Sequence, residues 1–331
     1  MKNGHDGAAN GAASIALDME WVEARNGRGP LVDEHVFLLG RPSLRQYLSF
    51  VNDIAVEGAA APEPELVSQW RAAHARIARR QATEADLADA PVIVPLPEPL
   101  TPLREALERD PVFRHGFSSV PTEIALVELD RLVVYQKHIN LEFTRQLRTR
   151  LGPEPAAEDV FRTCLPFDHP QPPVKFMRTG GGTFVFLSPS NDIRYLGSMT
   201  LKPENIVGHP LHGAVTAVIG LAVGFGSNFL NAIHCENRLV LNNGSHRAFA
   251  MRELGHTHAP CIVQHVGTRE ELKAVASGDL RRNPDHYLRG PRPSLLRDYF
   301  DPELRTVIPC TRRLRQVRLR YSTDESDLPA V

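Results

Sequence analysis

The sequence is poor in cysteine, has no long apolar run and carries almost no net charge. Its 331 residues include four cysteines, which lie far apart and form no C-x-x-C pair. This excludes a dense disulfide scaffold and makes a reducing, cytoplasmic setting the simplest expectation. The formal net charge of -1 argues against a protein built to coat nucleic acid, because such proteins usually carry an excess of basic residues.

The hydrophobic segments are short. No stretch reaches the roughly 20 apolar residues that a membrane helix requires, and the N-terminus lacks the apolar run of a signal peptide. The longest run, residues 214–225, is interrupted by Thr216, Gly220 and Gly224, and we interpret it as buried core. Hydrophobic residues still make up 42% of the chain, which is typical of a soluble globular protein.

Composition and periodicity divide the chain into three regions. Residues 1–19 are rich in small and polar residues, and we expect a disordered tail there. Residues 20–115 should be mostly helical, because apolar residues recur at helical spacing from Leu66 to Ile77. The five prolines within 91–102 exclude regular structure from that stretch. Residues 116–331 are expected to form an α/β domain.

The α/β domain should contain alternating strands and helices around a large insertion. Strand-like patterns occur at 123–129, 132–135, 183–187, 229–233, 238–241, 261–266 and 316–321. Helices are predicted at 141–151, at 245–254, with Gly255 as a left-handed end, and at 268–276, where Thr268 and Glu271 form a capping box. The insertion spans about 150–215; it includes a loop with six prolines at 153–173 and a glycine-rich hairpin at 180–182.

One turn concentrates groups that suit an anion. A predicted strand ends at Asn243, Gly244 permits a tight turn, and Ser245, His246 and Arg247 open the next helix. The free N–H groups of a first helical turn and the helix dipole favour negative charge. Ser245 adds a hydroxyl, His246 a donor whose charge can change near neutral pH, and Arg247 a guanidinium fork. The simpler alternative is a helix cap with a solvated arginine.

The order of elements around this turn resembles the ParB/sulfiredoxin superfamily. Gly244-Ser245-His246-Arg247 fits a G-x-x-R pattern, Leu254-Gly255 ends the helix, and Pro260 enters the next strand. Sulfiredoxins carry Gly-Cys-His-Arg at this turn and partition proteins carry Gly-Glu-Arg-Arg, and in both the turn binds nucleotide phosphates. The clear match covers about 225–266, and a weaker one covers 123–140. The resemblance implies a ParB/sulfiredoxin-like mixed-sheet core that binds a nucleotide at residues 243–247.

The departures from that family narrow the chemistry. Ser245 replaces the sulfiredoxin cysteine, so reduction of a sulfinic acid through a thiol is not expected. The chain shows no convincing helix-turn-helix pair, and its charge is balanced. A DNA-binding partition role is therefore the least supported interpretation. We expect an ATP-dependent phosphotransferase or nucleotide hydrolase that acts with Mg²⁺ on a small metabolite, or alternatively a non-enzymatic nucleotide sensor.

Candidate catalytic and substrate groups lie outside the turn. Glu128, His138 and Glu142 are candidates for a general base near the first strand of the domain, although a glutamate on an exposed helix face is the better explanation of Glu142. The polar turn that contains Ser190, Asn191 and Arg194 could hold an anionic substrate. A plain surface turn is the alternative there.

Two further patterns are set aside. Histidines and cysteines occur in pairs, but none has the ligand spacing of a metal site, so no metal ligands are assigned. The C-terminal segment carries Arg312, Arg313, Arg315, Arg318 and Arg320. We interpret these as solvation and edge protection, because the aromatic residues that would stack on nucleic-acid bases are sparse nearby.

Overall fold

A computed structural model of the chain describes residues 31–206 and 213–329, and the expected disordered tail at 1–19 lies outside the described residues. The helices, including three 3-10 turns labelled η, are α2 Leu44–Ile54, α3 Glu63–Glu84, η1 Glu98–Leu100, α4 Thr101–Arg109, α5 Pro111–Gly116, α6 Leu141–Leu151, α7 Ala157–Cys164, η2 Pro203–Asn205, α8 Ser245–Glu253, α9 Arg269–Val275, α10 Gly278–Arg282, α11 Pro284–Leu288 and η3 Leu296–Phe300. The strands are β1 Val32–Leu38, β2 Ile93–Pro95, β3 Thr122–Glu128, β4 Val133–Val134, β5 His138–Asn140, β6 Lys175–Thr179, β7 Thr183–Ser188, β8 Ile193–Leu201, β9 Val218–Phe225, β10 Asn231–Cys235, β11 Arg238–Asn243, β12 His258–His265, β13 Arg305–Thr311 and β14 Arg315–Arg320.

The main body is built on a six-stranded mixed sheet in the order β2-β3-β12-β10-β11-β4. Its central strands are apolar and almost fully buried, as continuous apolar runs predict for strands covered on both faces. Helix α8 follows β11 directly and packs against α6 and α7. The chain is therefore a mixed helix-and-sheet protein, and α8 begins at the carboxyl end of β11, an inner strand of the sheet.

A second, three-stranded sheet brings a strand near the start of the described chain next to one near its end. Strand β1 pairs antiparallel with β13 on one side and with β5 on the other. Helices α2 and α3 pack next to this sheet, and their apolar side chains form a core with it. The prediction of helices in the N-terminal region is confirmed for α2 and α3, but β1 was missed, because its hydrogen-bonding partners lie far away in the sequence.

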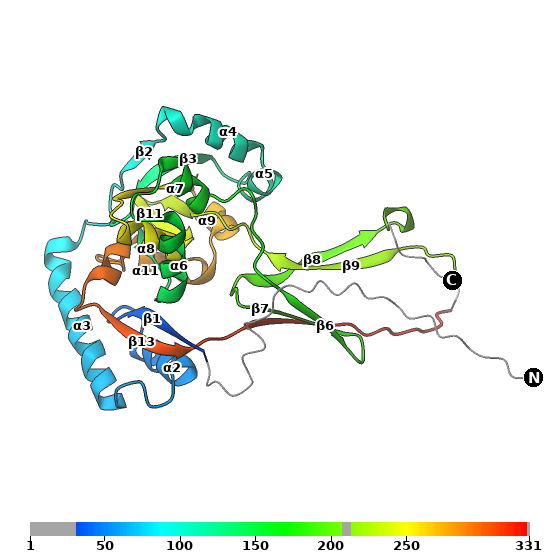
Figure 1. The fold of residues 1–331 in the computed structure, drawn as a ribbon, viewed down its shortest axis with the longest axis horizontal. Helices are drawn as coiled ribbons and strands as arrows, with labels where there is room; N and C mark the ends of the chain where they lie inside the picture. The colour runs from blue at the N-terminus through cyan, green and yellow to red at the C-terminus, as the bar shows by residue number, and fades with distance from the viewer. Residues whose placement is uncertain (1–30, 207–212, 330–331) are drawn as a thin grey trace, which may run out of the picture.

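The remaining strands form an elongated arm that extends away from the body (Figure 1). One sheet of the arm has the order β14-β7-β6, and the other is the β8–β9 hairpin. The glycine-rich hairpin predicted at 180–182 connects β6 and β7. We call residues 175–206, 213–225 and 313–321 the arm.

Three sequence predictions are corrected. The apolar run 214–225 is not buried core: among the described strands β9 pairs with β8 alone, and Ile219 is 64% exposed. The proline-rich stretch 91–102 does contain regular structure, because β2 is an edge strand and η1 has proline in its first turn, two places that tolerate proline. The loop at 153–173 contains α7, which the prolines flank without interrupting.

In the described part of the chain, no helix combines the length and the apolar character needed to cross a membrane.

Candidate functional site

The turn before α8 has a backbone that only glycine fits. Gly244 has φ +93°, and a Cβ atom on it would lie 2.9 Å from the Cα of Leu230. Both ends of the Asn243 side chain brace the turn: its Oδ1 accepts from the Gly244 N–H at 2.9 Å, and its Nδ2 donates to the Ser227 carbonyl at 3.1 Å. Asn243, expected to contact a ligand, therefore holds the loop in shape.

The first turn of α8 leaves backbone donors free. No side chain caps this helix, and the Gly244 carbonyl accepts from the N–H groups of Arg247 and Ala248. Within residues 31–206 and 213–329, nothing accepts a hydrogen bond from the N–H groups of Ser245 and His246. Such orphan donors at a helix N-terminus face an anion favourably, and the helix dipole adds partial positive charge.

Arg247 is the unusual member of the turn. Its side chain is buried, with 7% of the residue exposed, and no described residue forms a hydrogen bond or ion pair with its guanidinium. Burial lowers the pKa of Arg247, Cys164 and Asp192 raise it, and the charge of Arg150 lowers it. The Arg247 nitrogens are not among the fully buried atoms that lack a partner, so the guanidinium still reaches the surface of the turn. A largely buried cation without a hydrogen-bond partner is costly.

His246 behaves differently from its expected role. Its Nε2 accepts a hydrogen bond from the N–H of Asn140 at 3.0 Å, at the start of α6. Burial, followed by the charges of His35 and Arg247, lowers its pKa to about 4. The ring is therefore neutral at pH 7, and the prediction of a charge that changes near neutral pH is wrong. This hydrogen bond places the N-terminus of α6 next to the turn.

His138 also lies close to the turn but is a poor general base. Its Nδ1 is 3.0 Å from the Nδ1 of His35, and the structure brings His35 from β1, His138 from β5 and His246 from α8 together. Burial and the charges of His35 and His246 lower the pKa of His138 to about 3. A base this weak accepts a proton inefficiently at pH 7. His138 therefore fits packing of the turn better than catalysis.

The two glutamates proposed as bases do not reach the turn. Glu128 ends β3, two residues before Asp130, whose carboxylate binds Arg252 in the last turn of α8. Since α8 is about 13 Å long, Glu128 lies at the opposite end of the helix from Gly244. Glu142 accepts from Gln146 on the surface of α6, so the interpretation of Glu142 as a helix-face glutamate is the better one.

The polar turn between β7 and β8 lies nearer to Arg247. The Ser190 hydroxyl accepts from the Asp192 N–H within the turn itself, as in a plain surface turn. Asp192 accepts from the Gly226 N–H at 3.0 Å, and Arg194 lies 3.5 Å from the Asp192 carboxylate. No described residue forms a side-chain hydrogen bond with Asn191. Of this turn, Asp192 is the group whose charge acts on Arg247.

Sequence reasoning missed Asp192 and His35. Asp192 belongs to a turn that was already recognised as polar, so its carboxylate could have been included. His35 carries no local signal, because β1 reaches β5 only through the folded sheet. The burial of Arg247 was also not visible, since an arginine in a first helical turn is most often solvated.

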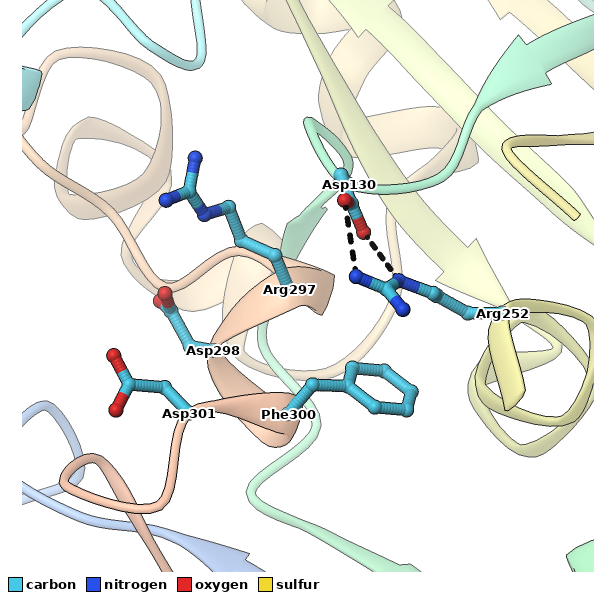
Figure 2. A pocket seen from close by; sticks show the side chains of 6 residues that line it. All are labelled: Asp130, Arg252, Arg297, Asp298, Phe300 and Asp301. Atoms are coloured by element: carbon cyan, nitrogen blue, oxygen red, sulfur yellow. Dashed lines mark hydrogen bonds and ion pairs between the residues drawn. The ribbon is translucent and has the colours of Figure 1, made fainter. Parts of the chain in front are cut away.

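A separate depression lies at the other end of α8 (Figure 2). It has a volume of about 420 Å³ and is lined by Asp130, Arg252, Arg297, Asp298, Phe300 and Asp301. Figure 2 shows the Arg252 guanidinium directed at Asp130, and the separation is 2.9 Å. Asp130, Asp298 and Asp301 each form an ion pair with an arginine. The charges that line the depression are therefore already compensated within the chain.

The described residues contain no group of three or more His, Cys, Asp or Glu side chains that could hold a metal ion. All four cysteines are buried and unpaired. Comparisons of the chain with protein-family models, with curated proteins and with solved structures gave no match.

Proposed function

We propose that the turn formed by Gly244, Ser245, His246 and Arg247 binds the phosphate groups of a nucleotide. The observation that carries the proposal is Arg247, a buried guanidinium with no described partner. Its fork can bind two phosphate oxygens at once. The free N–H groups of Ser245 and His246 supply further donors at the same helix end.

The neutral ring of His246 limits how much positive charge the turn offers to a phosphate. Because burial lowers its pKa to about 4, the ring adds no charge at pH 7, and within the turn itself the cationic group is Arg247. One guanidinium and two backbone donors suit one phosphate group, and the rest of a ligand must then extend outward past Asn243, which is exposed. The nucleotide itself is inferred from the resemblance of this turn to that of the ParB/sulfiredoxin superfamily.

Nucleotide sensing is the function that this geometry favours. Phosphoryl transfer requires a group that orients the attacking hydroxyl, but Glu128 lies at the far end of α8, Glu142 is on the surface of α6, and His138 is too weak a base. Binding needs none of these groups. A nucleotide that replaces the missing partner of Arg247 would stabilise the contact between α6 and α8, which meet at His246.

An ATP-dependent phosphotransferase is the second candidate, and Asp192 is the observation that favours it. Its carboxylate acts on the pKa of Arg247 and is fixed by the Gly226 N–H at 3.0 Å. A carboxylate beside a phosphate site can orient a hydroxyl or bind Mg²⁺ together with phosphate oxygens. Asp192 is a single carboxylate, so most ligands of a Mg²⁺ ion would come from the nucleotide and water.

Thermal shift measurements test the binding proposal. ATP and CTP should each raise the melting temperature of the wild-type protein, and citrate at equal concentration should raise it less. Arg247→Met should abolish the nucleotide shift while keeping an apolar side chain in the same space. Arg252→Ala is the matched control, because it removes an arginine at the opposite end of the same helix.

The outcomes separate the two ends of α8. A shift that survives Arg247→Met but disappears in Arg252→Ala would move the site to the depression of Figure 2 and refute the proposal. No nucleotide shift in the wild-type protein would refute nucleotide binding altogether. If nucleotides bind, an assay for phosphoryl transfer from labelled ATP to a panel of metabolites separates an enzyme from a sensor. If transfer is found, Asp192→Asn should eliminate it.

A further inference from the structure

The three-stranded sheet of the arm presents aromatic side chains on one face. Residues paired across antiparallel strands project to the same side. Phe176 pairs with Phe186, and Arg178 pairs with Phe184. On the other side of the central strand, Val317 and Leu319 pair with the same two phenylalanines. We call this set, together with Tyr321 beyond the end of β14, the aromatic face.

The aromatic face is the open side of the sheet. On the opposite side, Thr183 and Val185 of the central strand are buried, with 8% and 6% exposed. On the aromatic face, Phe176 is 56% exposed and Tyr321 is 48% exposed. Large aromatic side chains that stay exposed in a group mark a surface for binding, whereas isolated exposed apolar residues are ordinary.

The rings of the aromatic face form a connected row. The centroids of Phe176 and Phe186 are 5.0 Å apart, and those of Phe176 and Phe184 are 6.1 Å apart with near-parallel planes. Tyr321 stacks on Phe184 at 6.1 Å. The Arg178 guanidinium lies over the Phe184 ring at 5.7 Å. Flat rings in contact give a continuous π surface on which other flat groups can stack.

Both edges of this sheet are basic. Lys175 and Arg178 lie on edge strand β6, and Arg315, Arg318 and Arg320 lie on edge strand β14. The strands β6, β7 and β14 contain no acidic residue. In the described structure none of these five cations forms an ion pair. Arg178 and Arg315 pair with Phe184 and Ser188 and project to the side of the aromatic face. The other three pair with Leu187, Val185 and Thr183 and project to the opposite side. The aromatic face therefore carries two arginines and no acidic residue of these strands, which suits an anionic ligand.

The charge of the arm also differs from that of the rest of the chain. The arm holds eight basic and two acidic residues, the tail at 322–331 that follows it holds three acidic residues and no basic one, and the rest of the chain holds 30 basic and 34 acidic residues. A net charge near zero for the whole chain thus conceals a basic arm, an acidic tail and a slightly acidic remainder. The charge balance therefore disfavours nucleic acid at the body and favours it at the arm.

We propose that the aromatic face binds single-stranded nucleic acid, with bases stacked on the rings of Phe176, Phe184 and Tyr321. Arg178 on one edge of this face and Arg315 on the other neutralise phosphates of the strand. Single strands fit better than duplexes, because their bases can leave the stack and lie on an aromatic surface. An apolar protein partner would suit the rings but would leave Arg178 and Arg315 without counter-charges. The expectation that aromatic residues are sparse near the C-terminal arginines fails because β14 lies beside β7 in the fold.

Fluorescence anisotropy with labelled oligonucleotides tests this proposal on the full chain. A poly-dT and a poly-U strand should both bind, and a duplex of the same length should bind more weakly. Affinity should fall roughly seven- to twentyfold between about 50 and 200 mM salt if about two or three phosphates of the single strand are contacted. Phe176→Ala should weaken binding roughly five- to a hundredfold, whereas Phe176→Tyr, which keeps a ring, should retain it.

Matched controls separate stacking from charge and from folding. Tyr195→Ala removes another exposed ring, 45% against 56% for Phe176, from the β8–β9 hairpin, and Arg71→Ala removes an exposed cation from α3. Neither should change the affinity more than twofold. Arg178→Ala should weaken binding and reduce its salt dependence. Because Phe176 is exposed, melting temperature should not change in Phe176→Ala, so lost binding cannot be ascribed to unfolding.

Three results would overturn the proposal. The first is no binding of either single strand at low salt. The second is equal affinity of Phe176→Ala and the wild-type protein. The third is self-association in sedimentation that Phe176→Ala abolishes while oligonucleotides do not bind, since this assigns the aromatic face to a second copy of the chain. Arg247→Met should leave oligonucleotide binding unchanged, so failure here and failure of the nucleotide site are distinguishable.

Discussion

Arg292 and Arg247 are both buried, and they differ in what surrounds them. Arg292, in the bend before η3, is 1% exposed and forms two hydrogen bonds with Asp298, at 2.6 and 2.7 Å, and a third with Glu84. Arg247, at the start of α8, is 7% exposed and has no partner among the described residues. A third buried arginine, Arg238, resembles Arg292, because it pairs with Asp89 at 2.5 Å.

The difference between these arginines indicates where a ligand would bind. Transferring a guanidinium from water into the protein interior is costly unless hydrogen bonds and counter-charges replace the lost hydration. Around Arg292 the chain supplies both, so that region is structural. Around Arg247 the described chain supplies no hydrogen bond, and the nearby Asp192, whose charge raises the Arg247 pKa, lies beside Arg194; a phosphate would complete the arrangement. Substitutions and changes of pH can test this contrast, from the largest expected effect on stability to the smallest.

Arg292→Ala should have the largest effect. The substitution leaves Asp298 buried, with 3% exposed, and without its counter-charge. Removing one partner of a buried pair costs about 3–5 kcal/mol of unfolding free energy, and urea denaturation measures it. Arg297→Ala is the control: Arg297 is half-exposed and lies 3.7 Å from Glu84, so its loss should cost less than about 1 kcal/mol. Similar losses of unfolding free energy in both variants would contradict the claim that the buried pair of Arg292 and Asp298 stabilises the fold.

Gly244→Ala should be the next most destabilising change. Alanine at φ +93° is strained, and its Cβ would lie 2.9 Å from the Leu230 Cα. Together these should cost about 2–3 kcal/mol. Gly255→Ala provides the matched variant, because Gly255 has φ +89° but no atom within 4 Å of the added Cβ, so it should cost about 1 kcal/mol. Equal costs in denaturation would show that the close approach to Leu230 is not limiting.

Acidification should destabilise the turn through His246. Burial, with His35 and Arg247 nearby, lowers the folded-state pKa of His246 to about 4, while an unfolded histidine titrates at about 6.5. The unfolded state therefore binds a proton first as pH falls, so stability is full above about pH 6.5 and is lost as the pH falls toward 4. The loss should be about 2 kcal/mol between about pH 7.5 and pH 5.

His246→Gln isolates this contribution. A glutamine oxygen can replace Nε2 as acceptor for the Asn140 N–H, but it does not titrate in this range. His138, whose pKa is also low, and His35 remain in both proteins. The variant should therefore lose about 2 kcal/mol less than wild type over the same pH interval. Identical pH profiles from urea denaturation would contradict the low pKa of His246.

Local signals in the sequence were sufficient for parts of the fold and of the site. The helix predicted at 141–151 agrees with α6, and the capping box of Thr268 and Glu271 is present at the start of α9. Gly244 could be recognised as the turn residue because a strand, a glycine and a helix follow one another directly. Each of these features depends on residues only a few positions apart in the sequence. Periodicity and capping chemistry are therefore enough to predict them.

Features that depend on distant partners could not be predicted. Strand β1 was missed because β13 and β5 complete it. The apolar run at 214–225 was assigned to the core because its composition does not reveal that β9 has a single partner strand. Phe186 and Val317 become neighbours only when β14 pairs with β7. The missing counter-charge of Arg247 is likewise a property of the folded surroundings and has no local pattern.

Arg247→Met should have the smallest effect on stability, and it is the sharpest test of the comparison. Methionine fills much of the same space and removes a buried charge that no described residue pairs with. Replacing a buried charge by an apolar side chain is often neutral or stabilising, so unfolding free energy should change by no more than about 1 kcal/mol. Urea denaturation of Arg247→Met and Arg292→Met, side by side, measures the contrast: the same substitution should be severely destabilising at 292, because it strands Asp298. A loss at 247 as large as that at 292 would mean that Arg247 already has a partner inside the chain, and the phosphate site would then lose its physical basis.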